Sequence, residues 1–298
     1  MFTQRTLRET PLYIMILPAF ILTLIFAYVP MFGVIIAFMD YSPAMGFARS
    51  EWVGLDQFKM MIDMPEVSRA LKNTLYIASM KIVVGLIVPV IVSVLLNEVS
   101  QKWFKRSVQT MVYFPHFISW IILGGLFIDL LSLDGLVNRF LALFGVEPTM
   151  FLANNTAFPF VLVITDVWKN FGFGTIVYLA AITNINPSLY EAAMIDGANR
   201  WQKIRYITLP GMLPIIVLVA TLSIGDILNA GFEQVLTLYG PITYESGDII
   251  DTFVFRLGIN GAMFSLATAA GLFKSVVSII LISCSYYLAY RFANYRIF

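Results

Sequence analysis

Long apolar runs alternate with short polar segments along this chain of 298 residues. A helix needs about twenty predominantly apolar residues to cross the hydrocarbon core of a bilayer, and six runs reach that length. We expect membrane spans at about 11–39, 73–96, 108–131, 156–182, 211–232 and 262–290. The pattern therefore predicts an all-α integral membrane protein with six transmembrane helices.

The first apolar run follows two basic residues, Arg5 and Arg8, as the apolar part of a signal peptide would. It is longer than such a segment, and no small-residue cleavage site follows it. Pro18 and Pro30 lie inside the run, which membrane helices tolerate. We interpret it as an uncleaved first span.

Composition excludes several classes of protein. Hydrophobic residues make up 59% of the chain and charged residues only 12%, whereas about a quarter of the residues in a soluble domain are charged. The net charge of +1 gives no case for nucleic-acid binding. Cys284 is the only cysteine and His116 the only histidine, so neither an internal disulfide nor a multi-histidine metal site is supported.

Lysine and arginine are denser in the segments that six spans would place on one side of the membrane. By the positive-inside rule that side is the cytoplasm, so both termini are expected to be cytoplasmic. The polar segment between the fourth and fifth spans then faces the cytoplasm as well. The basic residues on this side are Arg5, Arg8, Lys102, Lys105, Arg106, Arg200, Lys203, Arg205, Arg291 and Arg296.

The polar stretch at 187–210 is too polar to span a membrane and too regular to be a slack loop. Asn186 or Ser188 can cap a helix start, and Pro187 suits the first helical position. Ser188 and Glu191 also have the spacing of a capping box. The pattern predicts a helix that begins near residue 187.

A turn and a second short helix are expected to follow. Gly197 permits a sharp turn that a residue with a Cβ would resist. The next segment, 199–206, is basic. The first helix presents one flat face that another protein could approach closely, formed by Leu189, Ala192, Ala193 and Asp196.

This stretch resembles the EAA loop of permease subunits in ATP-driven, binding-protein-dependent importers. The alternative is an amphipathic cytoplasmic loop with helix caps. The resemblance implies a type I ABC importer permease fold, in which the loop docks on an ATPase, Glu191 contacts it and Gly197 forms the bend. With Asp196 beside them, the matching positions are Glu191, Ala192, Ala193, Gly197, Ile207, Leu209 and Pro210.

The chain has no G-x-x-x-x-G-K-[ST] phosphate-binding loop, so an ATPase that powers it must be another chain. We therefore expect no enzyme activity and no cofactor in this chain, with ATP and Mg bound by the partner. The resemblance implies two ATPase subunits or domains, a second permease that is a different chain, and an extracytoplasmic solute-binding protein. It also implies a multi-pass location in a bacterial cytoplasmic membrane.

Four regions are expected along the chain. The extra transmembrane helix and external loop at 1–68 resemble the maltose-type sugar permeases. The permease core occupies 69–290 and contains the coupling helices at 186–210. A cytoplasmic tail covers 291–298.

Three further stretches, 165–173, 225–234 and 248–256, resemble the branch of oligosaccharide and polysaccharide-fragment importers that includes alginate uptake systems. Asp226 departs from this branch, where a neutral Asn or Ser is expected. With Glu233 it would repel an anionic sugar, so the charge of the substrate stays open.

Several ionisable and aromatic residues lie inside the expected spans. A charge near mid-membrane costs about 2.5–3.5 kcal/mol on insertion scales, so such groups pair or face a cavity. Asp166 and Lys169 share a helix face and either neutralise each other or a neighbouring helix, or line a translocation path. Lys81 and Lys274 either pair inside the bundle or snorkel. Ser223, Asp226, Asn229 and Glu233 form a polar stripe at helical spacing, which indicates a water-accessible cavity or packing contacts.

The aromatic residues Tyr113, Trp120 and Trp168 could stack on a sugar or simply pack in the bundle. The candidate translocation path consists of Tyr113, Trp120, Asp166, Lys169, Asp226, Asn229 and Glu233.

The sequence is interpreted as a carbohydrate permease subunit, for which an oligosaccharide is the expected substrate. The same machine could carry another solute, such as glycerol phosphate or a modified sugar. An ion-coupled transporter with Asp166, Lys169 and Asp226 as its relay is an alternative from another class. A membrane-embedded enzyme is disfavoured because the chain offers no recognisable nucleophile constellation.

Overall fold

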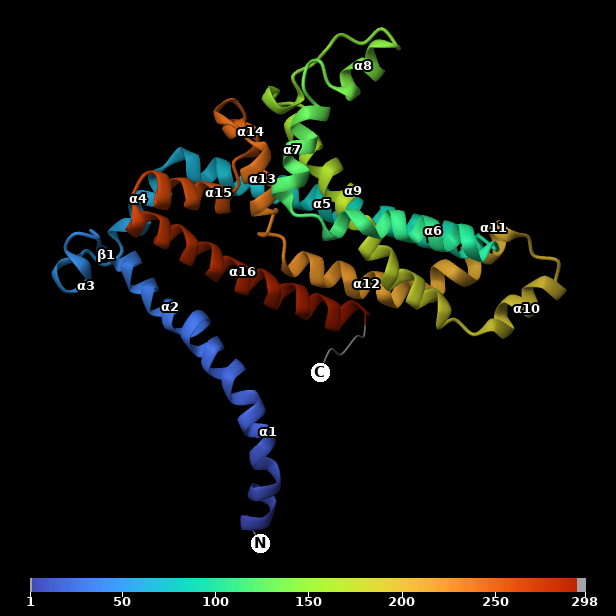
Figure 1. Ribbon diagram of the computed structural model, residues 1–298, viewed down its shortest axis with the longest axis horizontal. Coiled ribbons are helices and arrows are strands. Elements are labelled where there is room, and N and C mark those ends of the chain that lie inside the picture. Colours follow the sequence, from blue (N-terminus) through green and yellow to red (C-terminus); the bar gives the residue numbers. More distant parts are fainter. Residues whose placement is uncertain (1, 294–298) are drawn as a thin grey trace. The chain divides into compact units, whose positions relative to one another are not determined.

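A computed structural model of the chain describes residues 2–293, and the side chains of 11–287 (Figure 1). The expected tail at 291–298 and the basic residues Arg5, Arg8, Arg291 and Arg296 lie outside these described side chains. The chain is mostly helical and divides into two units, residues 1–64 with 254–273 and residues 65–253 with 274–298.

The first unit begins with a long apolar helix, in which α1 (Phe2–Thr23) continues through a π-helical turn (Leu24–Tyr28) and α2 (Val29–Met31) into a 3₁₀ segment (Phe32–Phe38). A short antiparallel pair follows, with Met39 of β1 opposite Trp52 of β2. The Tyr41 backbone N–H donates to Ser265 Oγ at 2.8 Å, so the chain after β1 is bonded to the start of α16. The other elements are β1 (Met39–Asp40), α3 (Gly46–Arg49), β2 (Glu51–Trp52), α4 (Asp56–Asp63), a π-helical turn (Arg256–Asn260) and the first part of α16 (Phe264–Ala293).

The second unit is a bundle in which α5 packs along α9, and α6 and α12 also contact α9. One apolar cluster joins Ile77 of α5 and Phe158 of α9 to Val235 and Ile249. Its helices include α5 (Pro65–Glu98), α6 (Lys102–Tyr113), α7 (Trp120–Leu130), α8 (Leu136–Ala142), α9 (Phe158–Thr183) and α12 (Leu209–Gly225). Shorter ones are α10 (Pro187–Ile195), α11 (Arg200–Lys203), α13 (Phe232–Leu238), α14 (Tyr244–Gly247) and α15 (Ile250–Phe255, at the border with the first unit); 3₁₀ turns cover Phe114–Phe117, Phe151–Ala153 and Pro241–Thr243, and a π-helical turn covers Ile204–Thr208.

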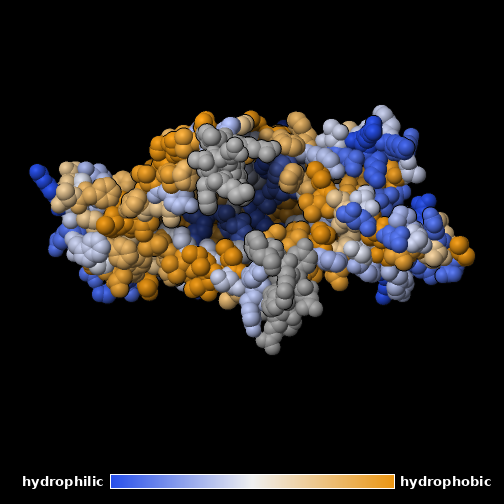
Figure 2. All heavy atoms as spheres, turned by 90° about the horizontal axis from the view of Figure 1, so that it is seen from below, coloured by the Kyte–Doolittle hydropathy of each residue, from blue (hydrophilic) through white to orange (hydrophobic). Residues whose placement is uncertain are grey.

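Five helices in the described residues are long and apolar enough to cross a membrane, at Pro11–Phe38, Pro65–Glu98, Phe158–Thr183, Arg200–Gly225 and Phe264–Tyr287. A bent pair, Lys102–Phe117 with Trp120–Leu130, supplies the sixth candidate. Hydrophobic residues cover much of the face that Figure 2 presents, as expected for a surface in contact with lipid. The six predicted spans thus correspond to five continuous candidate helices and, if the bent pair crosses as one span, a sixth.

The third span is not the straight helix that the apolar run at 108–131 predicted. The chain bends by 103° between the axes of its two helical halves. Pro115 lies in the 3₁₀ turn that ends the first half, and Ser119 caps the second half by accepting a hydrogen bond from the Ile122 backbone N–H at 3.4 Å. The first half ends because proline lacks a backbone N–H, and the serine cap four residues later starts the second half.

The fifth span also ends earlier than the expected 211–232. The α12 helix stops at Gly225, and irregular chain runs from there to Gly231. Gly231 has φ +92°, a left-handed conformation that glycine adopts at little cost and that starts α13. We call residues 226–231 the α12–α13 break.

Candidate functional site

The first candidate site is the polar loop at 187–210, which forms the predicted helix, turn and second helix. α10 covers Pro187–Ile195 and α11 covers Arg200–Lys203. Gly197 has φ +76°, and the Ala198 N–H donates to the Ala193 carbonyl at 2.8 Å, which closes the end of α10. Figure 1 shows α10 and α11 at the end of α9 and α12 that lies away from α7 and α8.

The capping of this loop differs in detail from the sequence prediction. Asn186 caps α10 by accepting from the Ser188 N–H at 3.1 Å, so Ser188 lies inside the helix and does not form the predicted capping box with Glu191. The capping box is one helix further on. There the Asn199 side chain accepts from the Gln202 N–H at 2.9 Å, and Gln202 Oε1 accepts from the Asn199 N–H at 2.7 Å.

The loop presents an open surface and is tied to the bundle on its other side. Three apolar side chains of α10, Leu189, Met194 and Ile195, are exposed. The Tyr190 hydroxyl lies 2.9 Å from Thr208 Oγ1, which is buried. Of the signature positions, Glu191, Ala192, Asp196, Gly197 and Pro210 are exposed, and Ala193, Ile207 and Leu209 are half-buried.

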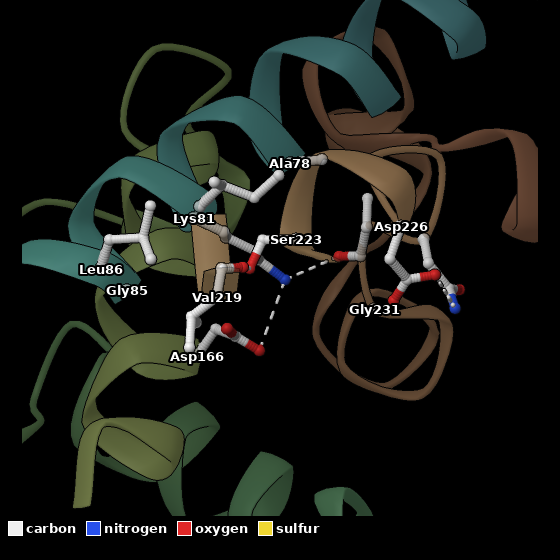
Figure 3. Close-up of a pocket in the computed structure, with 12 residues that line it drawn as sticks. Ala78, Lys81, Gly85, Leu86, Asp166, Val219, Ser223, Asp226 and Gly231 are labelled. Atoms are coloured by element: carbon white, nitrogen blue, oxygen red, sulfur yellow. Dashed lines mark hydrogen bonds and ion pairs between the residues drawn. The ribbon is translucent and has the colours of Figure 1, made fainter. Parts of the chain in front are cut away.

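The second candidate site is a cavity of about 250 Å³ inside the second unit (Figure 3). Its wall comes from α5, α9, the end of α12 and the α12–α13 break. The polar residues that line it are Lys81, Asp166, Ser223, Asp226 and Asn229. Polar groups gathered in a partly open cavity between apolar helices are the kind of feature expected where a hydrophilic solute crosses a membrane.

Lys81 lies at the centre of the polar groups around this cavity. Its Nζ donates to the Ala230 carbonyl at 2.7 Å and to Gln234 Oε1, and lies 3.6 Å from Asp166 Oδ1. Asp166 thus pairs with Lys81 of a neighbouring helix rather than with Lys169, and it also lines the cavity. Asp166 Oδ1 also accepts from Asn170 Nδ2 at 3.3 Å.

Lys169 is buried and contacts the break in the third span. Its Nζ donates to the His116 carbonyl at 2.6 Å and lies 5.7 Å from the centre of the Trp120 ring. His116 Nδ1 is 3.0 Å from Asn170 Oδ1. The cation therefore satisfies a carbonyl that the break in the third span leaves outside regular helix. Lys274 is paired too, because its Nζ lies 2.5 Å from Asp251 Oδ1.

The predicted polar stripe of the fifth span is only partly correct. Asp226 and Asn229 remain together, with Asn229 Nδ2 donating to Asp226 Oδ1 at 3.2 Å, and both line the cavity with Ser223. Glu233 does not line it, because α12 ends at Gly225 and Glu233 belongs to α13, where it is exposed. The residues therefore do not share one helix face.

The aromatic candidates lie outside the wall of this cavity. Trp120 is buried at the start of α7, and Tyr113 is half-buried at the end of α6. Gln234 was not predicted as a site residue from the sequence. Its Nε2 donates hydrogen bonds to Leu162 O and Thr165 Oγ1 at 2.7 Å each. A lone glutamine in an apolar segment was the available signal. The residues that the structure describes contain no group of three His, Cys, Asp or Glu that could hold a metal ion.

Comparison with known proteins places this architecture in a family. Residues 81–295 match the family model described as "Binding-protein-dependent transport system inner membrane component". The chain belongs to this family and is a transport permease subunit of the ABC importer type, located in a cytoplasmic membrane.

Individual relatives cover nearly the whole chain. The polygalacturonan/rhamnogalacturonan transport system permease protein YteP of Bacillus subtilis (strain 168) is 42% identical over 99% of this chain and 92% of its own length. A chain in the crystal structure of a bacterial ABC transporter involved in the import of the acidic polysaccharide alginate is 40% identical, with a TM-score of 0.88 over 98% of this chain and 99% of that chain.

A second crystal structure contains the bacterial alginate ABC transporter in complex with an alginate pentasaccharide-bound periplasmic protein. Its matching chain is also 40% identical and superposes with a TM-score of 0.87 over 97% of this chain and 96% of that chain. The predicted type I importer permease fold is thereby confirmed.

Proposed function

We propose that this chain forms part of the translocation path of an ATP-driven importer for an oligosaccharide derived from an acidic polysaccharide. The observation that carries the proposal is the near-complete superposition on the permease of an alginate importer, at 40% identity. The similarity to a polygalacturonan/rhamnogalacturonan permease supports the same substrate class, because uronic acids are part of both polymers.

In this proposal the loop at 187–210 receives an ATPase subunit. Leu189, Ala192 and Asp196 are exposed and share one side of the loop at helical spacing, so they supply a docking face, and exposed Glu191 supplies a charge. The bond from Tyr190 to Thr208 links that face to the segment that leads into α12. Movement of a docked ATPase would then displace α12 and the cavity beside it as a rigid-body change.

The proposed assembly has further members. A second, different permease completes the path, two ATPase subunits bind ATP and Mg, and an extracytoplasmic binding protein delivers the sugar. Both termini lie in the cytoplasm in this arrangement. The translocation path runs by the cavity residues Asp166, Asp226 and Asn229, while Lys169 and Trp120 support the wall at the break in the third span.

Co-purification tests the coupling part of this proposal. The tagged chain is expressed with the second permease, ATPase and binding protein encoded beside it, and the retained subunits are identified in detergent. Gly197→Pro is expected to release the ATPase, because proline cannot adopt φ +76°. Gly145→Pro is the matched control, since Gly145 has φ +77° and also has open space around it, but lies near α8.

Stimulation of ATP hydrolysis tests the substrate part. The complex with its binding protein is given alginate pentasaccharide, an oligogalacturonate or maltopentaose. Stimulation by an acidic oligosaccharide supports the proposal. Stimulation by maltopentaose alone would overturn the substrate class, and retention of the ATPase by the Gly197→Pro variant would overturn the role of the loop.

A further inference from the structure

Lys81 is a cation in the middle of α5 whose side chain is only 9% exposed. Its Nζ contacts groups from three other parts of the second unit. These are the Ala230 carbonyl in the α12–α13 break at 2.7 Å, Gln234 Oε1 on α13, and Asp166 Oδ1 on α9 at 3.6 Å. Figure 3 shows Lys81 directed toward Asp166. One ammonium group thus joins α5, α9 and the broken end of the fifth span.

The α12–α13 break has carbonyl groups that need donors from elsewhere. Helix geometry ends at Gly225 and resumes at Phe232, so the Ala230 carbonyl lies outside both helices. An unsatisfied backbone group inside a membrane protein is costly, and irregular backbone is tolerated at this depth only where the protein supplies partners. Lys81 supplies one, and it approaches so closely that a Cβ at Gly231 would lie 2.9 Å from Nζ.

Charge compensation of Asp166 does not by itself explain this arrangement. The 3.6 Å separation between Lys81 and Asp166 is longer than the bond from Lys81 to the Ala230 carbonyl. Asp166 Oδ1 has a second donor in Asn170 Nδ2. The shortest contacts of Lys81 are therefore those to the break and to α13.

The geometry points to Lys81 as a positioning residue that holds the α12–α13 break against α5 and α9. In doing so it fixes the wall of the cavity at Ser223, Asp226 and Asn229. The consequence for solute passage rests on the proposed function, whereas the effect on the break does not. Loss of Lys81 should loosen the break even when the charge of Asp166 is removed as well.

A pair of double variants separates positioning from charge compensation. Lys81→Met with Asp166→Asn removes both charges, so no buried carboxylate is left without a cation. Lys274→Met with Asp251→Asn is the matched control, because it removes another lysine–aspartate pair of the second unit that does not line this cavity. If Lys81→Met alone fails to accumulate in the membrane, the double variant still provides the comparison.

The labelling rate of a thiol placed in the α12–α13 break measures how well the break stays packed against α5 and α9. Ala230 is 1% exposed, so Ala230→Cys in a Cys284→Ala background should react slowly with a small methanethiosulfonate reagent. Lys81→Met with Asp166→Asn should raise the labelling rate about tenfold, the factor expected when a hydrogen bond from a charged donor is lost. The control pair should leave the rate within about twofold of the parent.

Uptake supplies the second measurement, made in the parent background without Ala230→Cys. The Lys81→Met/Asp166→Asn variant should raise the KM for the transported oligosaccharide by a similar factor at unchanged protein amount. Labelling and KM that match those of the parent chain would overturn the positioning role and leave Lys81 as a charge partner only. If the parent complex transports no oligosaccharide, the proposed function fails, and the labelling result still decides the role of Lys81.

Discussion

The hydroxyl groups of Tyr190 and Thr208 lie 2.9 Å apart, so α10 is hydrogen-bonded to the helical segment that leads into α12. Thr208 is buried, whereas the face of α10 that carries Leu189 and Ala192 is exposed. A force applied to the exposed face can therefore reach the fifth span through a fixed contact. This relationship makes the loop a candidate for mechanical coupling and leads to the first prediction.

Tyr190→Phe should weaken coupling without releasing the ATPase. Loss of one hydrogen bond costs about 0.5–1.5 kcal/mol, so stimulation of ATP hydrolysis by oligosaccharide should fall roughly two- to tenfold. Tyr206→Phe is the control, because the Tyr206 ring is exposed and its hydroxyl has no hydrogen bond within the described part of the chain. Equal stimulation in both variants would mean that the contact transmits nothing.

The bend after α10 should tolerate only residues that adopt a left-handed conformation. Gly197 has φ +76° and nothing within 4 Å of an added Cβ, so strain alone decides the outcome. Gly197→Ala should cost about 1–2 kcal/mol and weaken ATPase binding by roughly five- to thirtyfold. Gly197→Asn should lose less, since Asn visits this conformation more readily. Titration of the purified ATPase subunit onto the permease measures both values, and identical affinities for the two variants would contradict the argument.

Close packing of α9 against α6 at Gly172 should make this position intolerant of any side chain. A Cβ at Gly172 of α9 would lie 2.0 Å from the Val112 carbonyl oxygen, a backbone atom that cannot rotate away. Gly172→Ala should therefore destabilise the fold by about 1–3 kcal/mol and lower the Tm in detergent. Gly85→Ala on α5 is the matched control with nothing within 4 Å, and it should be neutral or slightly stabilising. An equal Tm for the two variants would show that α6 and α9 are not packed in this way.

The cavity carries one acidic residue that has no lysine partner close by in the described structure. Asp226 is bonded to Asn229, whereas Asp166 has Lys81. If an acidic oligosaccharide passes this wall, Asp226→Asn should lower its KM by roughly fivefold, corresponding to about 1 kcal/mol of relieved repulsion. The KM of a neutral oligosaccharide should not change. Glu233→Gln is the control because Glu233 lies outside the cavity wall, and an effect of equal size there would contradict the assignment of Asp226 to the path.

Much of the fold followed from local pattern, because membrane spans are long apolar runs and the cap residues lie beside the helices they start. Local pattern could not show the break in the third span, since Pro115 and Ser119 are also compatible with a continuous span. The capping box was misplaced for a similar reason. Asn186 and Ser188 are both residue types that cap helices, and the sequence pattern did not indicate which of them caps α10.

The candidate site depended on contacts between distant residues. Lys81 could be recognised as an unusual cation in an apolar run, but its partners at Asp166 and Ala230 are separated from it by 85 and 149 residues. The prediction that the polar stripe lies on one helix face was partly wrong, because it assumed helical spacing beyond Gly225, where α12 ends. Such contacts are decided by how helices pack, and periodicity within one helix carries no information about that.

Transport by the reconstituted complex is the most direct test of the central claim. Proteoliposomes that contain both permeases and the ATPase, with ATP enclosed on the ATPase side and loaded binding protein outside, should accumulate labelled acidic oligosaccharide. The Gly197→Pro complex and vesicles that hold ADP should accumulate none. Uptake driven by a proton or sodium gradient in vesicles without ATP would contradict the account and would make Asp166, Lys169 and Asp226 the centre of the mechanism.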